Sequence, residues 1–545
     1  MRYSIISAST VFVAGLLGLT SCGPTKTTCA DYVGCNDQGG AGQGGGPGAS
    51  GEAGETLGGA SGTSSGGGSA GSSGRGGAPN GGKSGASGAA GASGAAGDSG
   101  AGGEVIPPCD TTKSPSAEAC VVSNDYAIFV APTGNDSAGG VKAAPVKSLA
   151  KAVALAGDTK IVIACDGSYD EQVKLTTGAK LYGGFSCPGS AAPWTYEAGK
   201  KAKVAPSARG LALSIASGAS RVVIEDFEFD AQDGVDPGES SVAAFVNTST
   251  SVALTRVKLV AGKGVDGANG SVSPVTFPTQ ATLNGHAATG DTGGPFNLFM
   301  CPVGGSTTGA SGGNGGAGVT GGGLGAPDLG MGKGGTQGAC LGVGTGQDGA
   351  NASPQPPAAG ATKLGSITAM GWSGVSGTDG TPGTPGQGGG GGTGAATGGG
   401  GGGGGAGGCG GAGGTAGKAG GSSIALLMLN STLTMSANEL VAVSGGKGGS
   451  GLGGQDGQPL SANGGLPDAS GGCQGGKGGK GGAGGAGGGA AGGISVGIAY
   501  VGVSAPMPDS TTTITTGTAG AKGIGGVAGT NDGIAGVKQD VLQVL

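Results

Sequence analysis

Residues 220–236, SRVVIEDFEFDAQDGVD, have a counterpart in residues 250–267, TSVALTRVKLVAGKGVDG. In both copies apolar and polar residues alternate, change phase once, and then alternate again. This pattern is typical of a strand, a two-residue corner and a second strand, each with alternate side chains facing a core. A repeat of this length predicts coils that stack on one another, with Phe227 beside Val257.

Charged residues in the two copies favour the same register. With the copies aligned, Asp226 faces Arg256 and Glu228 faces Lys258. Opposite charges across a ladder contribute only about 0.2 to 1 kcal/mol each, but like charges would oppose the pairing. The charges therefore support stacking.

Apolar stretches far apart in the chain align with this repeat. SSIALLMLNSTLTM, which begins at residue 422, aligns with SSVAAFVNTSTSVAL from Ser240 and with ISVGIAYVGVS from Ile494. Glycine then resumes at a Lys-Gly pair in each case, at Lys263, Lys447 and Lys522. We predict that these stretches are rungs of one stack, and that glycine-rich excursions leave it at an equivalent corner.

The two long excursions, about 264–420 and 445–492, are either disordered loops or segments with a regular backbone structure of their own. Glycine recurs at every third residue in GWSGVSGTDGTPGTPG from Gly371, and at two of three positions in GGKGGKGGAGGAGG from Gly475. Three residues per turn is the period of the polyproline-II screw. Glycine at facing positions would let such segments approach until their backbone N–H and C=O groups pair. This favours a polyglycine-II form.

Residues 126–185 resemble the start of right-handed parallel β-helix proteins of the pectate-lyase-like class. The similarity lies in VAPTGND, KSLAKAVALA and GSYDEQV. Ser148 is the expected N-cap of a short helix that ends near Gly157. The resemblance implies an all-β fold, a right-handed parallel β-helix.

The glycine-rich half resembles PGRS-type proteins, particularly exported glycine-rich lipoproteins of myxobacterial type, for which polyglycine-II sandwiches are proposed. No PE-type N-terminal domain is present. The resemblance therefore extends to the architecture and not to the secretion or host interactions of the mycobacterial relatives.

The first 22 residues, MRYSIISASTVFVAGLLGLTSC, have the charge and apolar run of an export signal. The ending Leu19-Thr20-Ser21-Cys22 resembles a lipobox, which implies lipidation of Cys22 and, with glycine following it, sorting to the outer membrane. An ordinary cleaved signal is the alternative. Residues 23–104 are rich in Gly, Ala and Ser, and we expect them to be a disordered tether.

Ten cysteines follow Cys22, an even number that indicates disulfides in an exported protein. We expect neighbouring cysteines to pair, as Cys29–Cys35, Cys109–Cys120, Cys165–Cys187, Cys301–Cys340 and Cys409–Cys473. We expect no metal site, because the chain has no CxxC motif and a single histidine.

Glu225, Asp226, Glu228, Asp230, Asp233 and Asp236 form the acidic run, the strongest candidate for catalysis. β-Helix polysaccharide lyases use strand carboxylates to hold Ca²⁺ and an Arg or Lys as the base, and carboxylates suit such hard cations. The opposing interpretation is a solvated charged face, in which Arg256 and Lys258 neutralise two of the acids. We favour the latter.

Other motifs carry weaker signals. GAPNGGKS (77–84) matches a phosphate loop but lacks the flanking strand and helix. GASGAAGASGAAGDSG (85–100) has the collagen period without proline. His286 has no nucleophile motif near it, and Trp194 and Trp372 fit loop packing better than sugar platforms. With 27 basic and 33 acidic residues and no basic stripe, nucleic acid is not an expected partner.

The sequence therefore predicts an all-β chain that is lipid-anchored at the cell envelope, structural or adhesive, and without cofactor or catalytic activity. Expected partners are the membrane, through the lipid, and envelope polysaccharide or other surface proteins. The alternative is a β-helix lyase or hydrolase acting on acidic glycans. The predicted divisions are a signal peptide (1–22), the tether (23–104), cap and first rungs (105–263), an insertion (264–420), a rung (421–444), an insertion (445–492) and C-terminal rungs (493–545).

Overall fold

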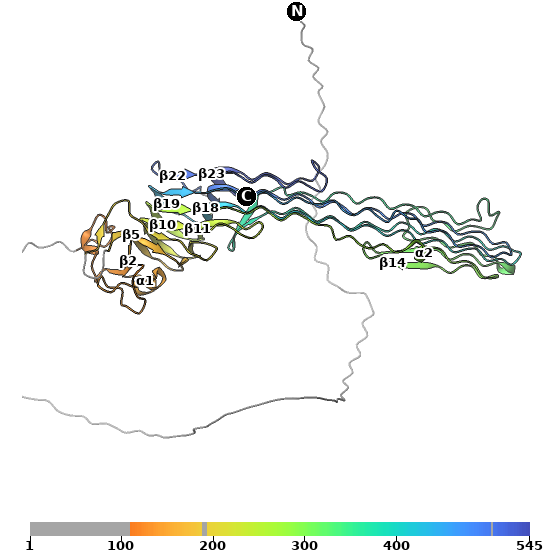
Figure 1. The fold of residues 1–545 in the computed structure, drawn as a ribbon, viewed down its shortest axis with the longest axis horizontal. Helices are drawn as coiled ribbons and strands as arrows, with labels where there is room; N and C mark the ends of the chain where they lie inside the picture. The colour runs from red at the N-terminus through yellow and green to blue at the C-terminus, as the bar shows by residue number, and fades with distance from the viewer. Residues whose placement is uncertain (1–108, 188–192, 503–504) are drawn as a thin grey trace, which may run out of the picture. The chain divides into compact units, whose positions relative to one another are not determined.

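The computed structural model describes residues 109–187, 193–502 and 505–545. These residues form three sheets of mostly parallel strands, together with long extended segments that run side by side (Figure 1). The signal peptide, the tether, Cys22, Cys29 and Cys35 lie outside the described residues, as do the motifs at 77–84 and 85–100.

Each of the three sheets is built from strands that recur along the chain. The first contains β1 (Ala127–Val130), β2 (Ile161–Cys165), β5 (Lys180–Ser186), β9 (Ser220–Glu225), β12 (Thr250–Thr255) and β19 (Leu433–Ser436), and β6 (Thr195–Tyr196) pairs antiparallel with β5. The second contains β3 (Gly167–Tyr169), β7 (Ala202–Val204), β10 (Phe227–Asp230), β13 (Lys258–Val260), β20 (Glu439–Val441) and β22 (Thr513–Thr515). The third contains β4 (Val173–Leu175), β8 (Leu213–Ile215), β11 (Ser241–Asn247), β18 (Ser423–Leu429), β21 (Ser495–Val501) and β23 (Lys538–Gln543).

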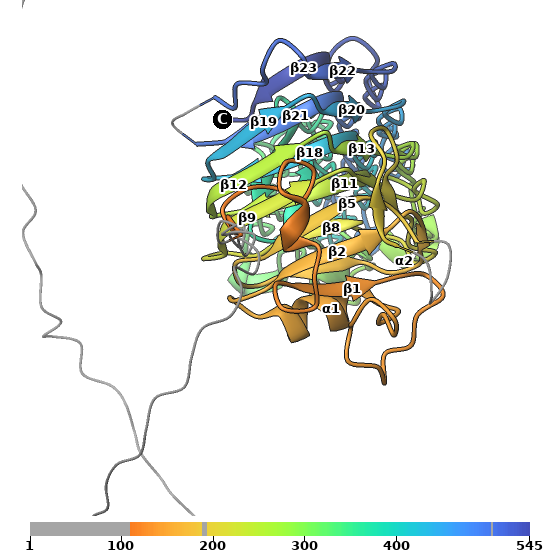
Figure 2. The same ribbon diagram turned by 90° about the vertical axis from the view of Figure 1, so that its left-hand side faces the viewer.

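The chain visits the three sheets in turn and repeats the circuit. For example, β9, β10 and β11 follow one another in sequence and lie in the first, second and third sheets. Figure 2 shows successive strands stacked from β1 and β2 up to β22 and β23. The pairs that join successive circuits are parallel, as expected for a β-helix-like domain.

The strand register confirms the predicted repeat. Ile224 pairs with Leu254 and Glu228 with Lys258. In the third sheet, Phe245 pairs with Leu427, although 182 positions separate them along the chain. The apolar stretch at residue 422 is thus a rung of the stack.

The corner between the first and second sheets contains one residue in the left-handed conformation. Asp226 has φ 57°, and Arg256 and Ala437 occupy the same position in the next two circuits with φ 53° and 54°. Non-glycine residues adopt this conformation only in a few per cent of cases. Its recurrence at one position explains the single phase change in the sequence pattern.

One hydrophobic cluster runs through the stack. It includes Leu181, Ile224, Phe227, Leu254 and Leu426, each fully buried or nearly so. Phe227 and Phe229 stack with ring centroids 5.6 Å apart. Side chains from all three sheets therefore share one core, which explains how so few aromatic residues suffice.

A short helix covers the start of the stack. Helix α1 (Leu149–Ala156) begins after Ser148, whose side chain accepts a hydrogen bond from Lys151 N–H, and it ends at Gly157. Both boundaries are as predicted. The carboxylate of Glu171 also accepts hydrogen bonds from the first two N–H groups of the helix.

The connections between the second and third sheets contain the glycine-rich sequence. They are short in the first circuits, such as residues 231–240 between β10 and β11. They then lengthen to 261–422, 442–494 and 516–537, each between a second-sheet strand and a third-sheet strand. Every excursion therefore leaves and rejoins the stack at the same corner.

We call residues 264–420, 445–493 and 516–537 the glycine bundle. Its extended segments hydrogen bond to one another through every third residue. Three successive bonds of one segment pair run from the N–H groups of Gly405, Gly408 and Gly411 to the carbonyl oxygens of Gly476, Gly479 and Gly482. This is the period of a three-residue screw, so the described excursions are ordered rather than disordered loops.

The segment at 472–493 is surrounded by others. Its N–H groups donate to carbonyl oxygens within 375–393, 446–465 and 531–534, and its carbonyl oxygens accept from N–H groups within 346–361, 402–420 and 520–526. From Gly475 to Gly488 two of every three positions are glycine, and a Cβ atom at these positions would overlap neighbouring backbone. The third position holds the exposed Lys477 and Lys480 and then the less exposed Ala483 and Ala486.

Asp and Asn side chains fix the register of parallel segments in the glycine bundle. In GQDGAN (346–351), Asp348 Oδ1 accepts from Lys477 N–H at 2.7 Å, and Asn351 Oδ1 accepts from Lys480 N–H at 2.8 Å. GVDGAN (264–269) makes the same pair of bonds, to the N–H groups of Lys447 and Ser450. These side chains specify which glycine segment lies beside which.

Smaller elements complete the described residues. They are the 3₁₀ turns Ala119–Val121 and Gly316–Gly318, helix α2 (Gln280–Leu283), the hairpin of β14 (Asn297–Met300) and β15 (Ser306–Gly309), and the hairpin of β16 (Gly365–Thr368) and β17 (Gly371–Gly374). Among the residues described, we find no helix with the length and hydrophobicity to cross a bilayer.

Candidate functional site

The acidic run extends from Glu225, the last residue of β9, through the corner and β10 into the connection that follows. Its best-buried member is Asp226, whose side chain is 3% exposed. Arg256, directly above it in the next circuit, donates from Nε to Asp226 Oδ1 at 2.8 Å and from a terminal nitrogen to Oδ2 at 2.9 Å. This two-point ion pair confirms the predicted contact of Asp226 with Arg256.

Other polar groups surround this pair. Arg256 also contacts Glu225 Oε2 at 3.0 Å, and the Tyr196 hydroxyl donates to Asp226 at 3.2 Å. Hydrogen bonds from Arg256 to Asp226 raise the pKa of the guanidinium above its usual value. Lys201 Nζ donates to the Arg256 carbonyl oxygen, and burial lowers the pKa of this ammonium group. Arg256 is thus a fixed cation held between two carboxylates.

A ladder of alternating charge follows the outer face of the second sheet. Lys203, Glu228, Lys258 and Glu439 occupy directly paired positions in β7, β10, β13 and β20. The closest ion pairs are Lys203 to Glu228, at 2.8 Å, and Lys258 to Glu439, at 3.4 Å. Lys258, the predicted partner of Glu228, lies opposite it in the ladder and lowers its pKa through its charge, whereas the direct ion pair of Glu228 is with Lys203 one circuit earlier.

Asp230 shares the Lys203 ammonium group with Glu228. Burial and the charge of Glu228 raise the pKa of Asp230, against the opposing effect of Lys203. Burial would also raise the pKa of Glu228, but the hydrogen bond and charge of Lys203 outweigh it and the pKa is lowered. The pKa values of the two acids that share this cation are therefore shifted in opposite directions.

The last two acids of the run are also engaged. Asp233 Oδ1 accepts from Lys263 N–H, and Asp236 pairs with Arg209 at 2.8 Å. Every carboxylate of the acidic run therefore has a cation or a backbone N–H as partner. A lyase-type site needs a free Arg or Lys as the base beside metal-binding carboxylates. Arg256, beside Asp226, and Lys203, beside Glu228, are already in ion pairs.

Four disulfides occur in the described residues. Cys109–Cys120 and Cys165–Cys187 confirm the expected pairing of neighbours. The expected pairs Cys301–Cys340 and Cys409–Cys473 are wrong, since the structure joins Cys301 to Cys409 and Cys340 to Cys473. The reason is that the excursions fold back along one another, so that cysteines distant in sequence meet within the glycine bundle.

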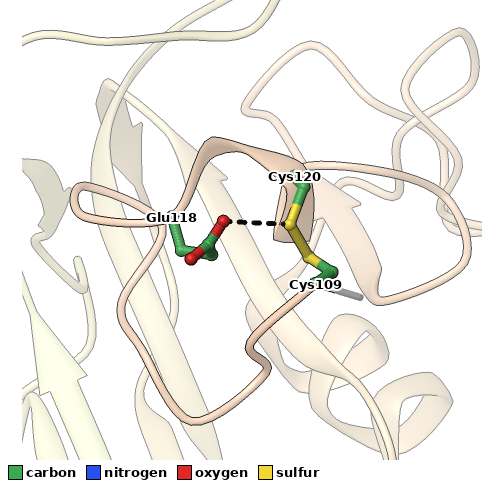
Figure 3. Close-up of side chains that lie close together, drawn as sticks. All are labelled: Cys109, Glu118 and Cys120. Atoms are coloured by element: carbon green, nitrogen blue, oxygen red, sulfur yellow. Dashed lines mark hydrogen bonds between the residues drawn. A yellow bond between two sulfur atoms is a disulfide. The ribbon is translucent and has the colours of Figure 1, made fainter. Parts of the chain in front are cut away.

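Two cysteine pairs lie beside a carboxylate. Glu118 Oε1 lies 3.2 Å from Cys120 Sγ. Figure 3 shows this carboxylate beside the disulfide bond that joins Cys120 to Cys109. Asp166 lies next to Cys165 and Cys187 in the same way. Metal binding by cysteine requires the thiolate, and these sulfur atoms are bonded to each other.

The other site residues considered from the sequence, His286, Trp194 and Trp372, lie in different surroundings. His286 is exposed, and its carbonyl oxygen accepts a hydrogen bond from Gly403 N–H within the glycine bundle. Trp194 is 7% exposed and packs edge-on against Phe129 with ring centroids 4.9 Å apart, as expected for a packing residue. Trp372 lines a cavity instead.

This cavity has a volume of about 530 Å³ and lies between the β16–β17 hairpin and the outer face of the third sheet. Trp372 and Met370 come from the hairpin, Val242 and Leu427 from β11 and β18, and Lys418 from the glycine bundle. Sequence reasoning missed it because its walls come from segments far apart in the chain. The one available signal was an aromatic residue within a glycine-rich stretch.

Comparison with known proteins gives one match. A family profile described as "Protein of unknown function (DUF1565)" matches residues 132–226, from the end of β1 to the Asp226 corner. This family is associated with parallel β-helix proteins, so the match supports the β-helix-like domain. No curated protein and no solved structure matches the chain.

Proposed function

We propose that this chain is a lipid-anchored structural or adhesive protein of the cell envelope, without catalytic activity. The observation that carries the proposal is the neutralisation of the acidic run, in which Arg256 binds Glu225 and Asp226, and Lys203 binds Glu228 and Asp230. Charges paired along a sheet stabilise its register and are not free to abstract a proton or hold a metal.

The architecture supports a scaffolding role. We propose that the three sheets close into a right-handed parallel β-helix, and that the glycine bundle is a polyglycine-II array. The β-helix and the polyglycine-II array would both extend a regular backbone over a long distance with few side chains. Such a structure suits a protein that projects from a surface. The proposed partners are the membrane, through the lipid, and envelope polysaccharide or other surface proteins, with no cofactor and no nucleic acid.

The proposed anchor is a lipid on Cys22 at the outer membrane. A disordered tether over residues 23–104 would have a span on the order of 50 Å, enough to hold the folded part away from the bilayer. Two or more acyl chains exceed what stable attachment requires, since each buried CH₂ contributes about 0.8 kcal/mol.

A Cys22→Ala variant tests the anchor. The lipid provides the only proposed attachment, so the variant is expected to move almost completely from the membrane fraction to the soluble fraction when cells are lysed and centrifuged. Ser21→Ala is the matched control, because alanine keeps a small residue before the cysteine, and it is expected to remain with the membrane. Retention of the Cys22→Ala chain in washed membranes would refute lipid anchoring.

Incubation with acidic glycans tests the absence of catalysis. Because the cations near the acidic run are held in ion pairs, the purified protein is expected to release neither unsaturated sugars, detected by ultraviolet absorbance, nor new reducing ends. A known polysaccharide lyase serves as the positive control on the same substrates. A steady rise in either signal that heat-unfolded protein does not give would establish the enzyme alternative.

A further inference from the structure

The cavity beside Trp372 combines apolar side chains, serine hydroxyl groups and one lysine. Its apolar lining comes from Trp372 on one side and from Val242 and Leu427 on the other, while Met370 is almost fully exposed at its rim. These residues adjoin a cluster on the outer face of the third sheet that the hairpin only partly covers. A cavity of this size, lined by both apolar side chains and polar groups, is large enough to hold a small ligand.

Lys418 is the only charged residue that lines the cavity. It is exposed and makes no ion pair with any described residue, whereas Arg256 and Lys203 are fully engaged. A lining that contains both an ammonium group without an ion-pair partner and an aromatic side chain favours a ligand that carries one negative charge and one apolar face.

Two hydroxyl groups of the lining retain a free proton. Ser240 Oγ accepts from Ser422 N–H at 2.8 Å, and Ser376 Oγ accepts from Ala419 N–H at 3.2 Å. Because a backbone N–H occupies one lone pair in each case, the O–H remains available to donate. The cavity therefore offers donors for ligand oxygens in addition to the Lys418 charge.

Trp372 Nε1 is buried and has no hydrogen-bond partner among the described residues. Most buried polar atoms are paired, and one that is not calls for an explanation such as a bound water or ligand. Trp194 differs, because its Nε1 donates to Lys142 O at 3.3 Å.

We propose that the cavity binds one carboxylated sugar residue of a polysaccharide. The apolar face of the pyranose ring lies against Trp372, the carboxylate pairs with Lys418, and ring hydroxyls accept from Ser240 and Ser376. This inference rests on the adhesive function proposed above, and it specifies the ligand class and the residues that bind it.

The test is titration of the whole folded chain with oligomers of β-1,4-linked glucuronic acid. Cello-oligosaccharides of equal length are the comparison, because they have the same chain with a hydroxymethyl group in place of each carboxylate. Saturable heat release in calorimetry is expected for the acidic oligomer, with at least tenfold weaker binding of the neutral one. Added salt is expected to weaken the acidic binding.

Substitutions locate the site. Lys418→Gln is expected to weaken binding of the acidic oligomer at least tenfold and to remove most of its salt dependence, and Trp372→Ala is expected to abolish binding. Lys447→Gln is the matched control, since Lys447 is an exposed lysine of the glycine bundle outside this cavity, and no change is expected. In a Trp194→Phe background, where Trp372 is the only indole, fluorescence provides an independent measure of occupancy.

Two outcomes overturn the proposal. Equal binding by Lys418→Gln and the unchanged chain would place the sugar elsewhere and leave an adhesive function intact. Failure of the unchanged chain to bind the acidic oligomer would exclude this ligand. Adhesion itself is measured separately, as binding of the soluble Cys22→Ala chain to isolated cell envelopes, so that its failure is distinguishable from failure of the site.

Discussion

Replacing Gly479 by valine is expected to destabilise the protein by about 3 kcal/mol or more, because the new side chain has no space. Gly479 lies in the surrounded segment of the glycine bundle, and a Cβ atom built there would overlap the Ala350 carbonyl group. Its N–H also donates to Gln387 O and its carbonyl accepts from Gly408 N–H. Displacing this residue therefore breaks contacts with three neighbouring segments. Thermal or denaturant unfolding measures the loss.

The adjacent position supplies the control. Lys480 is exposed, and its pairing uses the backbone alone, since its N–H donates to Asn351 Oδ1 and its carbonyl oxygen accepts from Ala352 N–H. Lys480→Val introduces the same side chain one residue away and is expected to change stability by no more than about 0.5 kcal/mol. If the two variants unfolded alike, or if amide hydrogens over 472–493 exchanged as fast as in an unfolded chain, the ordered glycine bundle would be disproved.

Removing the Cys340–Cys473 disulfide is expected to cost about 4 to 5 kcal/mol. The bond closes a loop of 133 residues, and in the chain-entropy description the loss of stability rises with loop length. A Cys340→Ala/Cys473→Ala double variant is the form to measure, since it leaves no free thiol. Its unfolding is compared with that of the unchanged chain under oxidising conditions.

The Cys109–Cys120 bond is the matched comparison, because its ends are only 11 residues apart. Its double alanine variant is expected to lose about 3 kcal/mol or less. Peptide mapping without reduction is expected to recover the Cys301–Cys409 and Cys340–Cys473 peptides from the unchanged chain. Recovery of Cys301–Cys340 and Cys409–Cys473 peptides instead would contradict the structure.

The register of the stack could be predicted from sequence because its cause is local. Alternating apolar residues, a phase change at Asp226 and a recurrence 30 positions later together leave one alignment of β9 on β12. Phe245 and Leu427 could be matched across a long insertion for the same reason, since each rung must present the same face to the core. Side-chain burial fixes such pairs wherever they lie in the chain.

The disulfides of the glycine bundle could not be predicted in this way. Nearness in sequence identifies a partner only when the intervening chain is short and turns back, as between Cys109 and Cys120. In the glycine bundle the partner depends on which segments run side by side. That choice depends on backbone hydrogen bonds and on side chains such as Asp348 and Asn351, which contact backbone N–H groups and leave no apolar pattern.

The candidate site likewise has one part that could be predicted from the sequence and one part that could not. The pair of Asp226 with Arg256 follows from the repeat and was predicted, because both residues occupy one corner position in successive circuits. The cavity beside Trp372 depends on where a hairpin from the first long excursion comes to rest on the third sheet. No periodicity in the sequence encodes that placement.

Every glycine-rich excursion leaves the stack of strands and rejoins it at the same corner. The length of an excursion can therefore change without disturbing the hydrophobic core. Gain or loss of whole triplets would lengthen or shorten the projecting array while each glycine keeps its orientation toward its neighbours. A change of one or two residues would instead rotate everything beyond it by a fraction of a turn and point side chains into closed backbone. Proteins descended from this chain can thus differ in the length of the glycine bundle, but only by multiples of three residues.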